Sequence, residues 1–341
     1  MISVKKNLTT LGWVTISNAH RFSKGKHGFQ ISDLLQELMV YAGQLDCYGR
    51  SHEVLQKFIS VEVSEAQVYR VTDCYGKQIG LTTDDTERTL CPLQKDEKLY
   101  IETDGSMIFT REEGWKEVKV GRLFKSGDCI RNDGKPGSIT HSQYMAHLGD
   151  CKVFRERMEE LIDAYGARPG QLVFISDGAP WIKNWVEDAY PDAVSILDYY
   201  HAAEHLYEFV NAYFKDKDRA KCWGKEQEKL LLESKVRRVI ENIKTVAGEE
   251  NETAVRLIDY YTTNQNRMDY TQYRKIGCGM IGSGAIESTH RTLVQKRMKQ
   301  SGQRWSKTGA QNMLNLRVTN MNEQWCKIIH LAKTDFCKCA A

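Results

Sequence analysis

The sequence lacks the features that mark membrane proteins, secreted proteins and zinc fingers. No stretch approaches the ~20 apolar residues of a membrane span, and the N-terminal residues MISVKKNLTT contain no apolar run typical of a signal peptide. The ten cysteines form no Cys-x-x-Cys pair, which excludes the usual zinc-binding patterns. Only five prolines occur in 341 residues, which argues against long disordered linkers. These absences predict a folded cytoplasmic protein with free thiols.

The chain is ordinary in composition but uneven in charge. With 41% hydrophobic and 27% charged residues, it can bury one sizeable core and carry accessory helices. The segment from Glu287 to Ala341 contains ten basic and three acidic residues, a local charge of +7, whereas the remaining 286 residues carry −4. Such a block can neutralise several phosphates, the dominant contribution to DNA affinity. A solvated helix face explains the same charges, so the block alone identifies no partner.

The N-terminal part, residues 1–95, is predicted to be a helical region. Apolar residues recur at helical spacing from Ser32 to Gly80, and Ser64-Glu65-Ala66-Gln67 has the form of a capping box at a helix start. Two short helices joined by residues 60–63 fit a helix-turn-helix, and they fit a small helical bundle without DNA contact equally well. The polar residues 81–95 are predicted to form a linker.

Residues 96–215 show alternating strands followed by buried strands between helices. The alternation of apolar and polar residues up to Asp104 is typical of antiparallel strands. Continuous apolar runs end at Asp177 and Asp198, as in strands buried on both faces. This order predicts an α/β fold with an RNase H-like mixed five-stranded sheet flanked by helices. The predicted strands lie at 99–104, 106–110, 118–123, 144–148, 172–175 and 193–197, and the predicted helices at 151–165, 181–189 and from about 201.

The remaining residues, 216–341, are predicted to form first an insertion into this core and then its last part. Residues 216–275 are charged segments with apolar stripes at helical spacing, which indicates an all-helical insertion. Residues 276–341 are expected to complete the catalytic core with a helix carrying Glu287 and to add the basic C-terminal segment.

Three carboxylates stand out as candidate catalytic and metal-binding residues. Asp104 and Asp177 each end a predicted strand and precede a glycine, and carboxylates at the ends of neighbouring strands meet in a common crevice. A turn residue or a helix cap is the alternative for either one. Oxygen ligands without nearby thiolates select Mg²⁺ or Mn²⁺ over zinc. The third, Glu287, follows the glycine-rich loop 280–286, which lacks the ending of a phosphate-binding P-loop.

Basic residues follow Glu287 closely, on either side of Gly302. A nuclease needs this pairing, because carboxylates hold metals while cations hold the flanking phosphates. The predicted DNA-binding residues are Arg291, Lys296, Arg297, Lys299, Arg304 and Trp305.

Several motifs, in the same order along the chain, resemble the bacterial insertion-sequence DDE transposases of the Kra type. They are DGAPWI from Asp177, ILDYYHAAEHL from Ile196, GSGAIES from Gly282 and RWS from Arg304. The resemblance extends over roughly residues 45 to 320. The run from Asp198 to His201 looks like the Asp-x-x-His signature that accompanies the second aspartate in these and in Mutator-like transposases.

The resemblance implies that Asp104, Asp177 and Glu287 form a DDE triad, with Asp198 and His201 near the active site. It also implies a helical insertion before the last acid. Two Mg²⁺ or Mn²⁺ ions, ~4 Å apart, would activate water and stabilise the leaving oxygen. The implied partners are DNA, both the element's terminal inverted repeats and the target DNA, and further copies of the chain in a synaptic complex. The implied location is the cytoplasm, in association with the nucleoid.

Two other functions stay open at this point. The run from His201 to His205 fits His-x-x-Glu-His, a zinc-protease signature with both histidines one helical turn apart. The second is a truncated or domesticated transposase that binds DNA without cleaving it, which the short N-terminal region suggests. The intact Asp104, Asp177 and Glu287 speak against this loss of catalysis.

Overall fold

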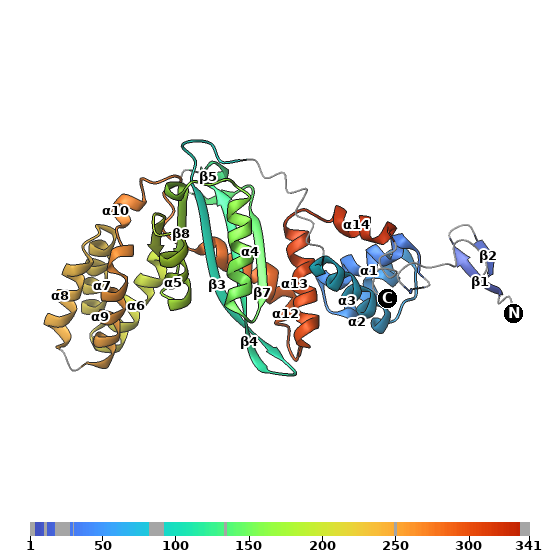
Figure 1. Ribbon diagram of the computed structural model, residues 1–341. Coiled ribbons are helices and arrows are strands. Elements are labelled where there is room, and N and C mark those ends of the chain that lie inside the picture. The colour runs from blue at the N-terminus through green and yellow to red at the C-terminus, as the bar shows by residue number, and fades with distance from the viewer. Residues whose placement is uncertain are drawn as a thin grey trace. The chain divides into compact units, whose positions relative to one another are not determined.

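The computed structural model describes residues 4–9, 12–17, 28–29, 31–81, 92–132, 135–248 and 251–334. The contacts within the chain divide it into two units, whose helices and strands are labelled in Figure 1. No helix among the described residues is long and apolar enough to cross a membrane. Unit 1 comprises Met1–Thr86, Met107–Lys116 and Arg291–Ala341, and unit 2 comprises Glu87–Ser106 and Glu117–His290.

A mixed five-stranded sheet underlies unit 2. Its strand order is β7-β4-β3-β8-β9, so the third, second, first, fourth and fifth strands of this sheet lie side by side. β3 and β8 are parallel, as are β8 and β9, while β4 and β7 are antiparallel. This is the strand order of an RNase H-like fold, which confirms the predicted fold class. The strands are β3 Leu99–Thr110, β4 Gly114–Lys125, β7 Gln143–Leu148, β8 Leu172–Ser176 and β9 Val194–Leu197.

Three helices follow the strands of this sheet, each with a start signal in the sequence. The Asp150 side chain accepts a hydrogen bond from the Lys152 backbone at the start of α4. Pro180 occupies the first turn of α5, where its missing N–H costs nothing. Asp198 caps α6. The helices are α4 Cys151–Asp163, α5 Pro180–Ala189 and α6 Tyr199–Tyr213.

Alternation along the strands separates two hydrophobic cores, one on each face of the sheet. Leu99 and Ile101 pack in the core formed with α4 and α5. Tyr100, between them, packs with Val173 of β8 in the core formed with α6 and the helices that follow it. Side chains alternate between faces along a strand, so residues two positions apart share one core.

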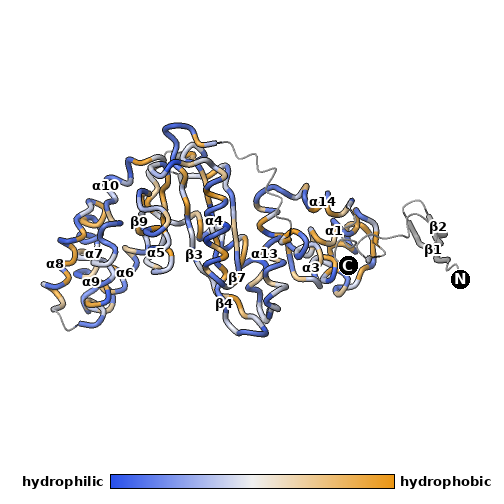
Figure 2. The backbone as a smooth tube through the Cα atoms, in the orientation of Figure 1, coloured by the Kyte–Doolittle hydropathy of each residue, from blue (hydrophilic) through white to orange (hydrophobic). Residues whose placement is uncertain are grey.

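The helices after α6 form the predicted all-helical insertion. Figure 2 shows hydrophobic and hydrophilic positions alternating along them, as amphipathic helices require. The Tyr261 hydroxyl donates to the Ala202 carbonyl at 2.7 Å and ties α9 to α6. The buried Arg267 guanidinium donates to the Ser176 hydroxyl and the Ile196 carbonyl, which ties the insertion to β8 and β9. The helices are α7 Lys217–Leu232, α8 Val236–Ala247, α9 Glu252–Asn264 and α10 Tyr270–Tyr273, with a 3₁₀ turn at Gln265–Arg267.

Unit 1 contains a helical bundle, with helices from both ends of the chain around one core. α3 and α13 approach closely, because a Cβ at Gly76 would collide with the Asn312 backbone. The capping box at the start of α3 is confirmed, since Ser64 and Gln67 exchange side-chain to backbone hydrogen bonds. The helices are α1 Asp33–Leu45, α2 Tyr48–Ile59, α3 Glu65–Leu81, α13 Lys307–Met321 and α14 Cys326–Lys333.

A helical run connects the core to the C-terminal helices and changes pitch part-way. It consists of α11 Gly284–Thr289, the π-helical segment His290–Gln295 and α12 Lys296–Met298. Such π segments are rare and frequently occur at functional sites.

The strand prediction was wrong at Asp104, which does not end a strand. β3 runs without interruption through Asp104 and Gly105. The glycine is explained by close packing instead of a turn, because a Cβ at Gly105 would collide with the Glu117 carboxylate on β4.

Two small antiparallel hairpins were not predicted from the sequence. The first pairs β1 Val4–Thr9 with β2 Gly12–Ser17 inside the region expected to be helical, so that prediction was wrong for these residues. The second pairs β5 Cys129–Asn132 with β6 Lys135–Ile139. Of the expected linker at 81–95, residues 82–91 lie outside the described part of the chain.

Trp185 on α5 should be a strong determinant of stability. Its side chain is 1% exposed and its indole Nε1 donates to the Glu159 carboxylate at 2.7 Å. Trp185→Ala should lower the free energy of unfolding by about 3–5 kcal/mol, measured by urea denaturation, because it leaves a large cavity. Trp115→Ala is the matched control, since Trp115 is 65% exposed and surface substitutions change stability by about 0.5 kcal/mol or less. Equal losses in both variants would contradict this assignment.

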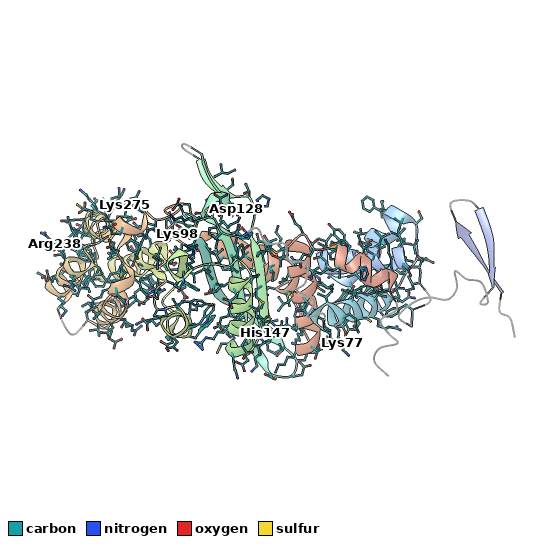
Figure 3. All side chains as sticks on the ribbon, turned by 45° about the horizontal axis from the view of Figure 1, so that its top comes forward. Lys77, Lys98, Asp128, His147, Arg238 and Lys275 are labelled. Atoms are coloured by element: carbon teal, nitrogen blue, oxygen red, sulfur yellow. The ribbon has the colours of Figure 1, made fainter. Side chains whose placement is uncertain are left out.

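His147, labelled in Figure 3, should make stability fall at acid pH. Burial lowers its pKa to about 4, and the charges of Arg157 and Lys119 act in the same direction. A histidine in the unfolded chain has a pKa of about 6.5, so protonation between these two values favours the unfolded chain. His147 therefore contributes stability that is present above pH ~6.5 and lost as the pH falls toward 4.

The measurement is the urea midpoint as a function of pH. The wild-type midpoint should fall more steeply between about pH 7 and pH 4.5 than that of His147→Gln. His141→Gln, at a side chain that is 78% exposed, should follow the wild type. A His147→Gln profile parallel to the wild type would show that His147 does not carry the effect.

Candidate active site

Strand register aligns three aspartates in one row across the sheet. β3 and β8 pair in parallel with a constant offset of 73 positions, from Leu99 opposite Leu172 to Glu102 opposite Ile175. Continued two residues further, this offset sets Asp104 opposite Asp177, in agreement with the effect of the Asp177 charge on the pKa of Asp104. β8 and β9 pair with a constant offset of 21 positions, which sets Asp177 opposite Asp198. The pairing reaches this level, since the Asp198 backbone N–H donates to the Ser176 carbonyl at 2.9 Å. We call these three residues the aspartate row.

The aspartate row lies on the face of the sheet that carries the core of α6 and the insertion. Because faces alternate along a strand, Asp104 shares its face with Tyr100, and Asp177 shares its face with Val173, both of which belong to that core. The row is graded in exposure, from an Asp104 side chain that is 37% exposed to a fully buried Asp198. The sheet therefore presents carboxylates side by side on one face.

Asp104 stands close to the helical run that carries Glu287. The His290 Nε2 atom, three residues after Glu287, lies 3.4 Å from the Asp104 Oδ2 atom. Burial raises the pKa of Asp104 and the charge of Asp177 raises it further, while His290 and the Gly105 backbone act against this. Asp104 thus lies next to the helical turn that follows Glu287.

Asp198 uses both carboxylate oxygens to hold protein groups. Its Oδ1 atom accepts from the backbone N–H of Tyr200 at 2.6 Å and of His201 at 3.3 Å, which fixes the start of α6. Its Oδ2 atom accepts from the Ser283 N–H at 2.9 Å and from the Ser283 hydroxyl. Asp198 therefore joins the end of β9, the start of α6 and the glycine-rich loop before Glu287.

The loop before Glu287 is also held by two side chains from β3 and β4. The Glu102 Oε2 atom accepts from the Ile286 N–H at 2.7 Å, and the Arg122 guanidinium donates to the Ala285 carbonyl at 2.9 Å. Glu102 is fully buried, and this burial raises its pKa to about 8. Together with Asp198, these contacts attach the loop to three strands, so the sheet that carries the aspartate row also positions Glu287.

Asp198, His201 and Glu287 form the one group in the described residues whose potential ligand atoms all lie within 4.8 Å of one another. Burial alone would lower the pKa of His201, but the Asp198 carboxylate and the hydrogen bond to Glu204 hold it above its usual value. The charges of Asp177 and Glu287 act on it in the same direction. His201 therefore lies close to Asp177, Asp198 and Glu287, three of the carboxylates of the candidate site.

The donor set fits a hard divalent cation. Asp104, Asp177 and Glu287 offer carboxylate oxygens, which suit Mg²⁺ and Mn²⁺, and imidazole at His201 suits Mn²⁺ better than Mg²⁺. The three predicted acids come from β3, the end of β8 and α11. The closest ligand group, however, contains Asp198 and His201 beside Glu287.

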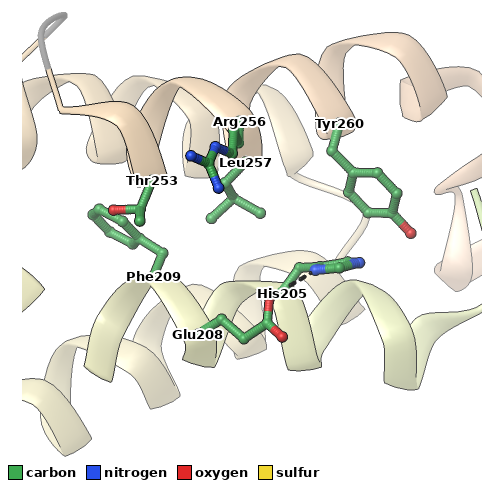
Figure 4. Close-up of a pocket in the computed structure, with 7 residues that line it drawn as sticks. All are labelled: His205, Glu208, Phe209, Thr253, Arg256, Leu257 and Tyr260. Atoms are coloured by element: carbon green, nitrogen blue, oxygen red, sulfur yellow. Dashed lines mark hydrogen bonds and ion pairs between the residues drawn. The ribbon is translucent and has the colours of Figure 1, made fainter. Parts of the chain in front are cut away.

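The insertion contributes Tyr260 to the neighbourhood of Asp177. A Cβ at Gly178 would collide with the Tyr260 ring, so the glycine after Asp177 permits this contact. His205 packs edge-on against the same ring at 4.7 Å between centroids. Both residues line a pocket of about 400 Å³ between α6 and α9, together with Glu208 and Arg256 (Figure 4).

The structure gives no support to a shared zinc site at His201 and His205. The His201 Nδ1 atom lies 3.4 Å from Glu204, and the His205 Nδ1 atom lies 3.0 Å from Glu208. Among the described residues, His205 belongs to no group of ligands that a metal can join. Each histidine of the His-x-x-Glu-His pattern pairs with the glutamate one turn ahead of it.

The six predicted DNA-binding residues belong to unit 1 and differ in exposure. Arg291, Lys296, Lys299 and Arg304 are exposed, as a phosphate-binding surface requires. Arg297 is only 1% exposed and donates from Nε to the Gly43 carbonyl at 3.0 Å. Trp305 is also buried.

Sequence reasoning missed three residues of the site. Glu102 and His290 had a signal, since each lies on the same face as a predicted acid, two residues before Asp104 and three after Glu287. Tyr260 had none, because it comes from an insertion helix whose docking on Gly178 is a tertiary contact.

Residues 26–333 match the family described as Uncharacterised protein family (UPF0236). The chain belongs to this family. The UPF0236 protein in vanSb 3'region of Streptococcus gallolyticus is 25% identical over 240 residues, which cover 67% of this chain and 51% of the relative. This UPF0236 chain thus spans about half the length of that curated relative.

A solved structure also matches this UPF0236 chain, at a low level. It is the Drosophila P element transposase strand transfer complex, with a TM-score of 0.32 and 8% sequence identity. The match covers 89% of this chain and 82% of that chain. A similarity of this strength carries no argument about mechanism.

Glu102 should control the order of the loop that carries Glu287. Glu102→Ala removes the acceptor for the Ile286 N–H, so hydrogen exchange at residues 281–287 should accelerate roughly tenfold or more, as expected for a lost buried hydrogen bond. Glu102→Gln keeps an acceptor oxygen and should retain protection. Exchange in β8 is the internal reference. Unchanged exchange of the loop in Glu102→Ala would refute this positioning role.

Proposed function

We propose that this chain catalyses metal-dependent cleavage and transfer of DNA strands, as a DDE transposase with Asp104, Asp177 and Glu287 as its acids. The observation that supports the proposal is the register of β3 and β8, whose continuation past Glu102 and Ile175 brings Asp104 opposite Asp177 on one face of an RNase H-like sheet. The loop before Glu287 is bound to the same sheet through Glu102 and Asp198.

Two divalent ions, Mg²⁺ or Mn²⁺, would supply stabilisation of both the attacking and the leaving oxygen of a phosphodiester. In this proposal the chain's own residues hold the two ions in place. Asp104 and Asp177 offer carboxylates from a rigid sheet, and Glu287 is placed by a loop with four anchoring contacts. A rigid support matters because displacements of about 1 Å reduce catalysis strongly.

Asp198 and His201 have a positioning role in this proposal. Asp198 is fully buried and its two oxygens hold α6 and Ser283. The His201 backbone N–H donates to Asp198, and its Nδ1 atom lies 3.4 Å from Glu204, so the ring is held at the start of α6. The compact group formed by Asp198, His201 and Glu287 is a second place where one of the ions could bind.

The proposed substrate is DNA, both the terminal inverted repeats of an element and its target. The exposed Arg291, Lys296, Lys299 and Arg304 would contact phosphates, while Arg297 and Trp305 would act from a buried position. The resemblance to Kra-type insertion-sequence transposases supports this substrate. On this proposal the chain works in the cytoplasm at the nucleoid, as a homo-oligomer that holds two DNA ends.

Cleavage of plasmid DNA in the presence of Mg²⁺ or Mn²⁺ tests the proposal. Asp177→Asn and Glu287→Gln should each lower the rate by more than about a hundredfold, because metal stabilisation contributes several kcal/mol. Asp188→Asn on α5 is the matched control, since this carboxylate is exposed and outside the site. DNA binding should persist in all three variants.

The outcomes separate the alternatives. Equal cleavage by Asp177→Asn and the wild type would refute the assigned triad. Binding of DNA by the wild type without any cleavage in either metal would favour the non-catalytic, domesticated protein. Mn²⁺ titration of Asp104→Asn and Asp198→Asn would show which aspartate holds the ion, since the true ligand should lose Mn²⁺ affinity.

A further inference from the structure

A second pocket, lying wholly within unit 1, has an unusual lining of arginines and aromatic rings. Its volume is about 350 Å³, within the range of about 300 to 1,000 Å³ that is typical of ligand sites. No aspartate or glutamate is among the described residues that line it. Such a lining suits a ligand with a negative charge and a flat ring. The residues that carry the argument are Tyr48, Tyr69, Arg111, Arg297, Arg304 and Trp305.

Arg297 forms the inner wall of this arginine–aromatic pocket. Its guanidinium lies over the Tyr48 ring at 4.9 Å and over the Trp305 ring at 5.0 Å. Although the side chain is 1% exposed, its Nη2 atom has no hydrogen-bond partner among the described residues. A buried donor without a partner is costly, and burial lowers the pKa of Arg297. The wall therefore contributes a buried positive charge and two covered rings, while the groups that a ligand can reach lie on the other lining residues.

The rim of the pocket is rigid but keeps two cations accessible. The Arg111 N–H donates to the Trp305 carbonyl at 2.8 Å, and the Trp305 N–H donates to the Phe109 carbonyl at 3.2 Å, which joins two distant segments. The Trp305 indole donates to the Met298 carbonyl at 3.0 Å. The side chains of Arg111 and Arg304 remain exposed. Both residues line the pocket, so they place accessible positive charge at its mouth.

Tyr69 supplies the open ring surface. It is 43% exposed and meets Tyr48 edge-on, with 5.4 Å between the ring centroids. Arg297 covers the Tyr48 and Trp305 rings from one side, so Tyr69 is the aromatic residue with the most accessible surface at this site. Nucleic-acid bases stack on such rings regardless of sequence.

We propose that the arginine–aromatic pocket binds one unpaired nucleotide of the DNA, with its base on Tyr69 and its phosphate on Arg111 and Arg304. This rests on the proposed function above, in which DNA is the substrate. A base paired inside the helix is stacked on both faces and cannot stack here, whereas a base that has left the helix can. The pocket thus selects DNA with a frayed, nicked or single-stranded position.

The test uses the full chain and short DNA duplexes that carry 2-aminopurine, a fluorescent base, either in a single-stranded tail or in the paired region. All measurements are made in EDTA, so that cleavage plays no part. The wild type should bind the tailed duplex more tightly and change its fluorescence. Tyr69→Leu should weaken binding of the tailed duplex by about tenfold and leave binding of the paired duplex unchanged, in line with the size of base stacking.

Charge variants check the second half of the proposal. Arg111→Ala and Arg304→Ala should each weaken binding of the tailed duplex more than binding of the paired duplex. Arg70→Ala is the matched control, because Arg70 is exposed, follows Tyr69 on α3 and does not line the pocket. Tyr69, Arg111 and Arg304 are all exposed, and unchanged circular dichroism will verify that their variants fold.

Two results would overturn the proposal. The first is equal wild-type affinity for tailed and paired duplexes, and the second is an equal effect of Tyr69→Leu on both. Asp177→Asn should bind both duplexes like the wild type. If the active-site proposal alone fails, the wild type will not cleave DNA but will still prefer the tailed duplex. Failure of the pocket proposal would appear as lost selectivity with intact cleavage.

Discussion

The register between β3, β8 and β9 is the constraint on which the site depends. Because both pairings are parallel and keep constant offsets, Asp104, Asp177 and Asp198 fall at one level of the sheet. A slip by one residue would turn an aspartate to the opposite face, which is filled by the apolar core of α4 and α5. Burial of Leu99 and Ile101 in that core therefore fixes the alignment of the carboxylates.

The last acid reaches the site through polar contacts instead of a strand. The loop before Glu287 has its backbone or side-chain groups bound by Glu102, Arg122 and Asp198. Burying a carboxyl such as Glu102 is unfavourable unless it is neutral or bonded, and its raised pKa agrees with the neutral form. The protein thus accepts buried polar groups at the start of α11, where they fix the backbone next to Glu287.

The sequence allowed the sheet, its strand order and the insertion to be predicted, because strand and helix periodicities there are strong. It also allowed Asp177 to be placed correctly, at the end of a buried apolar run. Asp104 was misplaced because the following glycine resembled a turn, whereas it makes room for Glu117 across the sheet. The contact of Tyr260 with Gly178 arises only after the insertion helix docks, and no local pattern encodes it. The DNA-binding role of the basic residues stays a prediction.

Two arginines of the basic C-terminal segment have a structural role within the protein. Arg297 donates to the Gly43 carbonyl, and Arg317 donates to the carbonyls of Gln44 and Leu293, so both guanidinium groups complete the end of α1. Two positive charges that a sequence count would assign to phosphates are thus already engaged by the protein's own backbone. If the chain binds DNA, fewer counterions will be released than the nominal charge implies, and its affinity will be correspondingly less sensitive to ionic strength.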